Sequence, residues 1–225
     1  PIKGAAKIPA ITTRVEVSEA TVSVASPPIT LQQVNGEFVY EYPRGIADGS
    51  LAARFENQDV LLDLNLDAAE LGLSQKGLSI ATSARLGGAD VNRLLGVTVS
   101  DGLLEGNSAF DIVFQAGDGV ALNVTSDLDG LAIGLPVPFS KAREQSEPLE
   151  MDLRISDAVS IDATYSNNLS LSIVQDGENA WRALASIGEV SSELTLDDVD
   201  TGTAVISGRV EELDISAWAD TQARF

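Results

Sequence analysis

The alternation of apolar and polar residues at every second position is the feature that most constrains the fold of this chain. In its clearest stretch, residues 60–67, four aliphatic side chains alternate with Leu61, Asp63, Asn65 and Asp67. Successive side chains of a β-strand point to opposite faces of the sheet, so this pattern predicts a strand with one apolar and one polar face. The same period recurs around residues 120–125, 149–155, 159–165 and 169–175. We therefore expect an all-β fold built mostly of antiparallel strands, as an elongated, curved sheet.

Other strands are expected where short apolar runs are bounded by Gly, Pro, Asn or Asp. Their ranges are 13–24 (two short strands turned at 18–20), 38–42, a hairpin of 45–55 and 59–67, 77–86, 103–106, 109–116, 119–128, 180–187, 193–196 and 203–210. Short helices are expected near residues 89–95, 141–147 and 216–223, the first because Asp90 or Asn92 can cap a helical turn.

Composition excludes several classes of function. The chain has 225 residues with no cysteine and no histidine, which removes disulfides, thiol nucleophiles, histidine bases and the commonest metal ligand. Its formal net charge of -20 argues against a nucleic-acid surface and against electrostatic docking on anionic lipid headgroups. No apolar run approaches the ~20 residues of a membrane helix. The first residues show no signal peptide, and we expect the chain to be a segment of a longer protein.

The sequence signals for a metal site or a catalytic site are weak. Asp197, Asp198 and Asp200 could ligate a hard cation such as Ca²⁺, but the spacing lacks the glycine and terminal glutamate of an EF-hand loop, which favours a solvated turn. Serine catalysis would need a base, and no nucleophile motif surrounds any serine. We expect a protein that is not an enzyme, with no cofactor and no metal.

An internal repeat is a further expectation. Residues 85–94 align without a gap on residues 209–218, and both copies read as a strand, a turn and a capped apolar helical turn. The repeat would divide the chain into units at 1–97 and 98–225 that share one continuous sheet.

Two segments carry a resemblance to a known family. Residues 126–141, SDLDGLAIGLPVPFSK, and residues 206–218, ISGRVEELDISAW, resemble segments of the YhdP group of large AsmA/TamB-like envelope proteins of Gram-negative bacteria. The resemblance implies an internal fragment of a periplasmic, inner-membrane-anchored protein. It also implies a curved β-groove that carries phospholipid acyl chains between the inner and outer membranes.

The groove would be lined by the apolar face of the strands. A groove of aliphatic side chains suits acyl chains because apolar burial is non-directional and scales with area. The expected lining residues are Val60, Leu62, Leu64, Leu66, Val120, Leu122, Val124, Leu153, Ile155, Ile161, Leu171 and Ile173.

Two alternatives remain open from the sequence. The apolar faces of the strands could pack on one another in a closed, dry β-sandwich with a structural or adhesive role and no ligand. A hydrolase is the third reading. An open, aliphatic interior favours lipid transfer over the sandwich, and a cleft with converging polar groups would favour the hydrolase.

Overall fold

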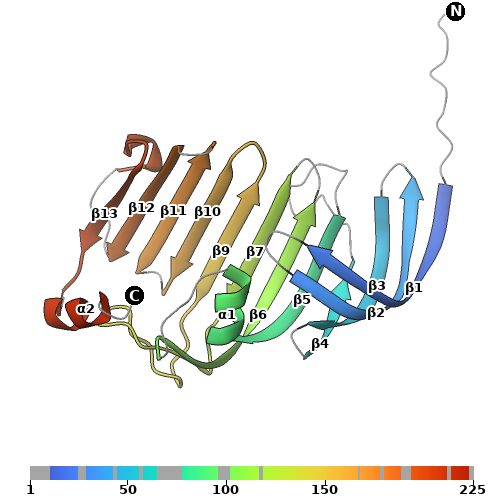
Figure 1. Cartoon of the computed structure of the whole chain (residues 1–225), viewed down its shortest axis with the longest axis horizontal. Coiled ribbons are helices and arrows are strands. Elements are labelled where there is room, and N and C mark those ends of the chain that lie inside the picture. Colours follow the sequence, from blue (N-terminus) through green and yellow to red (C-terminus); the bar gives the residue numbers. More distant parts are fainter. Residues whose placement is uncertain are drawn as a thin grey trace, which may run out of the picture.

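The strands form one open sheet. The computed structural model describes residues 11–24, 29–42, 45–55, 58–64, 78–95, 102–116, 119–166, 168–177, 180–188, 194–211 and 214–222. Within these ranges lies one 13-stranded, curved sheet whose strands follow one another in chain order, all antiparallel except the last pair (Figure 1). The expected all-β, mostly antiparallel curved sheet is confirmed.

The first half of the sheet consists of β1 (Ile11–Val24), β2 (Ile29–Tyr42), β3 (Gly45–Phe55), β4 (Gln58–Asp63), β5 (Leu78–Gly87) and β6 (Leu104–Ala116). The second half consists of β7 (Val120–Ser126), β9 (Leu149–Ile155), β10 (Val159–Tyr165), β11 (Leu169–Asp176), β12 (Ala180–Gly188) and β13 (Thr203–Arg209). The short strand β8 (Leu131–Ile133) pairs only with β6. Two helices, α1 (Gly88–Leu95) and α2 (Ile215–Gln222), and the 3-10 turn η1 (Leu196–Asp198) complete the described elements.

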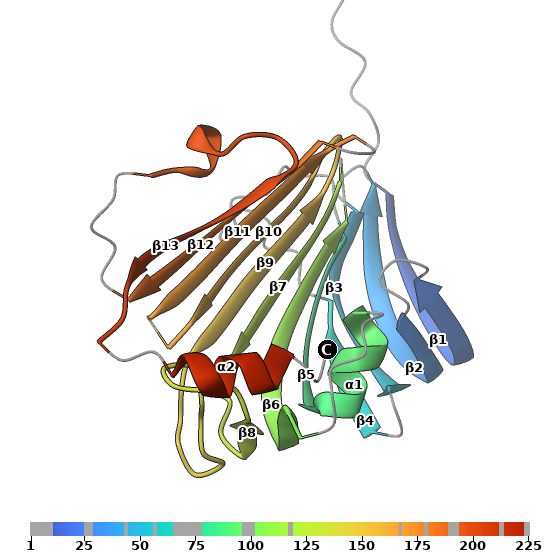
Figure 2. The ribbon, with the colours of Figure 1, turned by 60° about the vertical axis from the view of Figure 1, so that its left-hand side comes forward.

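The two ends of the strands differ. Helix α1 follows β5, and residues 127–148, which we call the excursion, connect β7 to β9 at the same end of the sheet. Helix α2 follows β13 and also lies at this end, which we call the helix end (Figure 2). At the opposite end, the turn end, short links at residues 117–119, 156–158 and 177–179 join neighbouring strands of the second half. The two helices and the excursion are therefore all concentrated at the helix end of the sheet.

Bulges bend the first two strands. The β1–β2 register shifts between Val17 and Ala20, and Glu19 has a positive φ of 51°. The Asn35 side chain accepts a hydrogen bond from the Glu19 amide at 2.8 Å and donates one to the Gln33 carbonyl at 2.7 Å, which satisfies backbone groups that the ladder leaves free. The expected turn at residues 18–20 is therefore wrong, because a bulge lets β1 continue as one strand.

Three other sequence expectations need correction. The ranges 103–106 and 109–116 belong to one strand, β6, whose first residues pair with β8 and whose remainder pairs with β7. Residues 194–200 hold η1 and not the strand expected at 193–196, of which residue 193 lies outside the described residues. The strand expected at 119–128 ends at Ser126.

The helices expected near 89–95 and 216–223 are confirmed by α1 and α2, but the helix expected at 141–147 is wrong. Lys141 instead forms an antiparallel bridge with Ile133, with N–O distances of 2.9 and 3.0 Å in the two directions. Its ammonium group donates to the carbonyls of Leu131 and Ala142 at 2.8 and 3.1 Å. A β-bridge to a residue eight positions earlier thus takes the backbone groups that a helix would have used.

The proposed repeat is reproduced only in outline. Both segments run from a strand into a helix at the helix end, but α1 begins directly after β5 while five residues separate β13 from α2. The aligned aspartates also act differently, since Asp214 caps α2 by accepting from the Ala217 amide, whereas Asp90 accepts from the Gly87 amide. The division into units at residue 97 stays a prediction, although the sheet itself is continuous.

The tightest apolar packing lies on one face of the first half of the sheet. Phe38 of β2 lies directly opposite Gly49 of β3, where an added Cβ would come within 2.4 Å of the Phe38 Cβ. Leu64, which follows β4, is 2% exposed and donates its amide to the Gly49 carbonyl, whereas Leu61 on the other face is 63% exposed. The curved first half therefore contains a core of buried apolar side chains.

This difference gives a direct test on neighbouring leucines. We expect Leu64→Asp to lower the free energy of unfolding by about 3 kcal/mol or more, because an unpaired carboxylate would be buried in an apolar core. Leu61→Asp should change it by less than about 0.5 kcal/mol, since the side chain stays in water. Urea denaturation of both variants measures the difference, and equal effects would contradict the closed core.

Candidate functional site: one apolar face across the sheet

The strand registers place the expected lining residues on one face, which we call the apolar face. Leu122 of β7 lies opposite Leu153 of β9, Leu153 lies opposite Ile161 of β10, and Ile161 lies opposite Ile173 of β11. In the first half Leu62 of β4 pairs with Leu51 of β3. The Asp63–Ala81 pair joins β4 to β5 with Asp63 on the opposite face, so Leu62 and Leu64 on either side of Asp63 lie on the apolar face. Leu66 lies outside the described residues.

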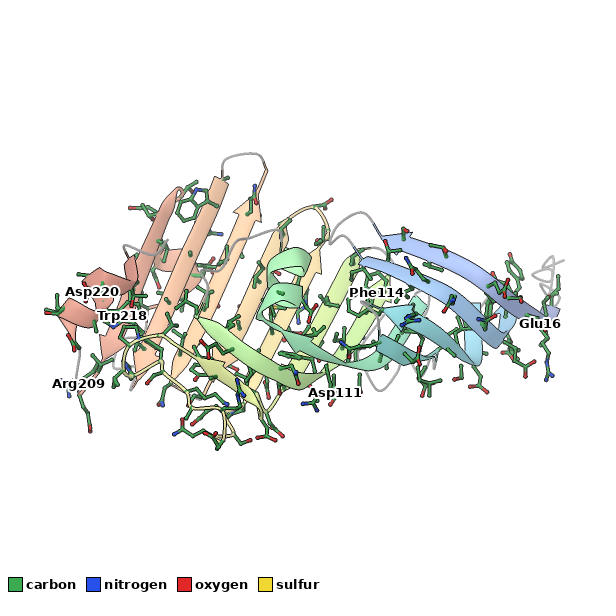
Figure 3. The ribbon with its side chains drawn as sticks, turned by 60° about the horizontal axis from the view of Figure 1, so that its bottom comes forward. Glu16, Asp111, Phe114, Arg209, Trp218 and Asp220 are labelled. Atoms are coloured by element: carbon green, nitrogen blue, oxygen red, sulfur yellow. The ribbon has the colours of Figure 1, made fainter. Side chains whose placement is uncertain are left out.

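Two strands on which no lining residue was expected, β5 and β6, continue this face. Ile80 of β5 lies opposite Phe114 of β6, and Phe114 lies opposite Leu122. Asp111, three residues before Phe114 on β6, points to the opposite face, as an odd spacing on a strand requires (Figure 3). The signal for these residues was present in the sequence as the same alternation, but β6 contains Phe and Ala where the other strands have Leu and Ile.

The opposite face is mainly polar, although Leu184 of β12, which pairs with Ser172, is buried there. Asp63 and Asp162 are exposed, and Asn123 and Thr125 are half-buried. Asp152 and Asp162 are direct cross-strand neighbours, and they accept hydrogen bonds from Asn123 at 3.2 Å and Ser172 at 2.7 Å. The residues expected on the polar face therefore lie there, except Asn65 and Asp67, which fall outside the described residues.

Burial divides the apolar face into two parts. Val60, Leu62 and Leu64 in the first half are buried. The second half is different, since the expected lining residues of β7 to β11 are half-buried, apart from Val124, which is buried: Val120, Leu122, Leu153, Ile155, Ile161, Leu171 and Ile173. The same face thus serves as a buried core beneath β3, β4 and the helix-end parts of β5 and β6, and as an accessible aliphatic surface across β7–β12.

The excursion covers the apolar face at the helix end. Leu128 and Leu131 are buried in the same apolar cluster as Val124 and Tyr165. Beyond the cluster, Phe139 of the excursion meets Trp218 of α2 edge-on, with ring centroids 5.8 Å apart. Trp218 is labelled on α2 in Figure 3. Buried contacts therefore hold the excursion on the sheet, and an aromatic contact joins α2 to the excursion.

Burial shifts two pKa values beneath this cover. Desolvation lowers the pKa of the Lys141 ammonium group below its usual 10.5, opposed by the charges of Asp129, Glu147 and Glu144. Burial raises the pKa of the Tyr165 phenol above its usual 10.0, and the charge of Glu147 raises it further. Lys141 is the residue that sequence reasoning missed, because its burial depends on the folding of the excursion.

The candidate cation ligands have another role. Asp198 accepts hydrogen bonds from the amide and the hydroxyl of Thr195, each at 2.8 Å, and these bonds lower the pKa of its carboxyl. Among the described residues, no three His, Cys, Asp or Glu side chains gather closely enough to hold a metal ion. No helix among the described residues is long and apolar enough to span a membrane.

The buried phenol predicts a pH dependence. Above pH 10 the unfolded chain ionises Tyr165 while the folded protein keeps it neutral, so the unfolded state binds fewer protons and stability falls as pH rises. We expect Tyr165→Phe to make the loss of unfolding free energy above pH about 10 less steep. Urea denaturation at a series of alkaline pH values measures the slope. A difference between the two proteins that does not change with pH would contradict the assignment.

Comparison with known proteins gives one match. No curated protein and no solved structure matches the chain. The family model described as YhdP protein matches residues 2–225, nearly the whole chain, in agreement with the resemblance in residues 126–141 and 206–218. The chain, with its one curved sheet and its aliphatic face, therefore belongs to the YhdP family.

Proposed function

We propose that this chain is a segment of a periplasm-spanning protein that moves phospholipid between the inner and outer membranes, with the acyl chains lying on the apolar face. Membership of the YhdP family indicates a Gram-negative envelope protein of the lipid-transport type. The phospholipid, the route between the two membranes and the anchoring of the full-length protein in the inner membrane are parts of the proposal.

The half-buried aliphatic surface of β7–β12 is the observation that carries this proposal. The described strands form one sheet, so the closed β-sandwich expected as the alternative is not the architecture. An aliphatic surface left accessible to water gains about 25 cal/mol for each Å² that an acyl chain covers. Because this gain has no preferred direction, a chain can slide from one strand to the next without breaking a specific contact.

The polar groups of the second half are arranged in a way that suits sliding. Asp152, Asp162 and Ser172 lie on the opposite face, where Asp162 accepts a hydrogen bond from Ser172 and Asp152 accepts one from Asn123. An acyl chain moving along Leu122, Leu153 and Ile161 would therefore meet no hydrogen-bonding side chain from the middle of these strands. The path would run across the strands, following their order in the sheet.

The closed core restricts where lipid contact is expected in this conformation. Leu64 at 2% exposure leaves no surface for an acyl chain, so lipid contact at Val60, Leu62 or Leu64 would require the first half to open. Contact at β7–β12 requires no such change. Probes for lipid therefore belong in the second half.

Photocrosslinking in cells tests the proposal. We expect a photoreactive amino acid at Leu153 or Leu171 to crosslink to phospholipid, because both side chains lie on the half-buried part of the apolar face. The same probe at Ser172, the neighbour of Leu171 on the polar face, should give no lipid adduct. Mass spectrometry of the purified adducts makes the measurement.

A second variant separates loss of lipid contact from loss of the fold. Leu153→Asp should keep most of the thermal stability, since water reaches this position, and should reduce crosslinking from Leu171 by placing a charge in the path. Equal lipid adducts from Leu171 and Ser172, or none from Leu153 and Leu171 in a stably folded protein, would rule out acyl-chain passage along this face.

A further inference from the structure

The tyrosines and tryptophans of this chain are sorted toward the ends of the strands. The chain has three tyrosines and two tryptophans. Tyr40 and Tyr42 end β2, Tyr165 ends β10, Trp181 is the second residue of β12, and Trp218 lies in α2 at the helix end. Phe110 and Phe114, which have no polar atom, lie within β6, and Phe55, which ends β3 at the helix end, is buried. Aromatic rings with a polar atom therefore mark both rims of the apolar face.

The two rims differ in exposure. At the helix end Tyr165 is buried and Trp218 packs against Phe139 of the excursion. At the turn end Tyr40, Tyr42 and Trp181 are 40%, 45% and 41% exposed. The uncovered rim therefore presents three half-exposed amphipathic rings.

The registers place these three rings on the apolar face. Tyr40 lies opposite Ile46, a residue packed on the apolar cluster, and Tyr42 lies opposite Ile11 at the start of β1. Trp181 lies opposite Gln175, two positions along from the Ile173–Ala183 pair of the apolar face. Each ring thus has the aliphatic surface on one side and solvent beyond the strand end on the other.

Charge at the turn end is negative. Asp157 lies in the link from β9 to β10, and Asp200 lies beside the turn whose Gly202 amide donates to the Trp181 carbonyl at 2.7 Å. Within the described part of the chain neither carboxylate has an ion-pair partner, whereas the arginines of β9 and β12 are paired: Arg154 lies 3.9 Å from Asp152, and Arg182 lies 3.7 Å from Asp176 and 3.5 Å from Asp197. This rim therefore complements an ammonium group and repels an anionic headgroup, in a chain whose net charge is -20.

We propose that the turn end of the apolar face across β7–β12 receives the headgroup of a zwitterionic, ammonium-bearing phospholipid, with Trp181 at the boundary between acyl chains and headgroup. The inference rests on the proposed function and adds the orientation of the lipid and the class of its headgroup. Tyrosine and tryptophan suit such a boundary because one end of each ring is apolar and the other forms hydrogen bonds to water or polar groups.

Tryptophan fluorescence reports the depth of the lipid. Trp218→Phe leaves Trp181 as the single tryptophan and removes an indole N–H that has no hydrogen-bond partner among the described residues. The variant is loaded with phosphatidylcholine brominated either near the glycerol or near the methyl end of its acyl chains. We expect bromines near the glycerol to quench Trp181 at least about twofold more, because collisional quenching requires contact with the ring.

Trp181→Phe provides the matched control, since it leaves as the single tryptophan Trp218 of α2, which contacts Phe139 of the excursion. Neither brominated lipid should quench this protein appreciably. Stronger quenching of Trp181 by bromines near the methyl end, or equal quenching by both lipids, would overturn the headgroup placement while the bound lipid still supports transport. Absence of any bound phospholipid in native mass spectrometry would overturn both the proposed function and this inference.

Competition between headgroups tests the charge argument. Phosphatidylethanolamine should displace bound brominated lipid several-fold better than phosphatidylglycerol with the same acyl chains. The preference should shrink at high salt, because the screening length falls from ~8 Å at physiological ionic strength to ~3 Å at 1 M. It should also shrink in the double variant Asp157→Asn, Asp200→Asn. An equal or stronger competition by phosphatidylglycerol at low salt would overturn the zwitterionic assignment.

Discussion

Burial of a single continuous apolar face is the requirement on which the rest of this structure depends. Cross-strand pairing aligns Leu122, Leu153, Ile161 and Ile173 into one row, and polar side chains such as Asp152 and Asp162 lie on the other side of these strands. Most all-β domains meet this requirement by packing two sheets face to face. Here the described strands lie in one sheet, so the apolar face must be covered by curvature, by loops or by something other than this protein.

The chain uses two of these solutions in different places. In the first half, bulges bend β1 and β2, and Phe38 lies close beside Gly49 of the neighbouring strand. On the apolar face of this half Leu64 is almost wholly buried. At the helix end the excursion lays Leu128 and Leu131 on the face, with the Lys141 ammonium bonded to the Leu131 and Ala142 carbonyls. Neither solution reaches the turn end of β7–β12, where the aliphatic side chains remain half-buried.

Local pattern was enough to predict most of the strands and the face each residue takes, and it failed where the structure depends on pairings that the two-residue period does not record. The alternation at Leu62 and at Leu122 needs only the geometry of a strand, so the sequence contains it completely. The excursion is different, because Lys141 pairs with Ile133 and its charge is satisfied by carbonyls, which no helical or strand period records. The bulge at Glu19 likewise depends on Asn35 of the next strand. The closure around Leu64 follows from the curvature of several strands together, and no single stretch of sequence carries that information.

The uneven cover of the apolar face connects stability to function. A sheet that closed along its whole length would be more stable, because every additional Å² buried contributes about 25 cal/mol, but it would have no surface left for a ligand. A sheet open along its whole length would lack the buried core to which Leu64, Val34 and Phe55 belong. The closed first half can therefore stabilise the fold while the second half keeps its aliphatic surface accessible. The polar-edged ring of Trp181 then lies at the uncovered rim of the second half, where an amphiphile would pass from an apolar to an aqueous environment.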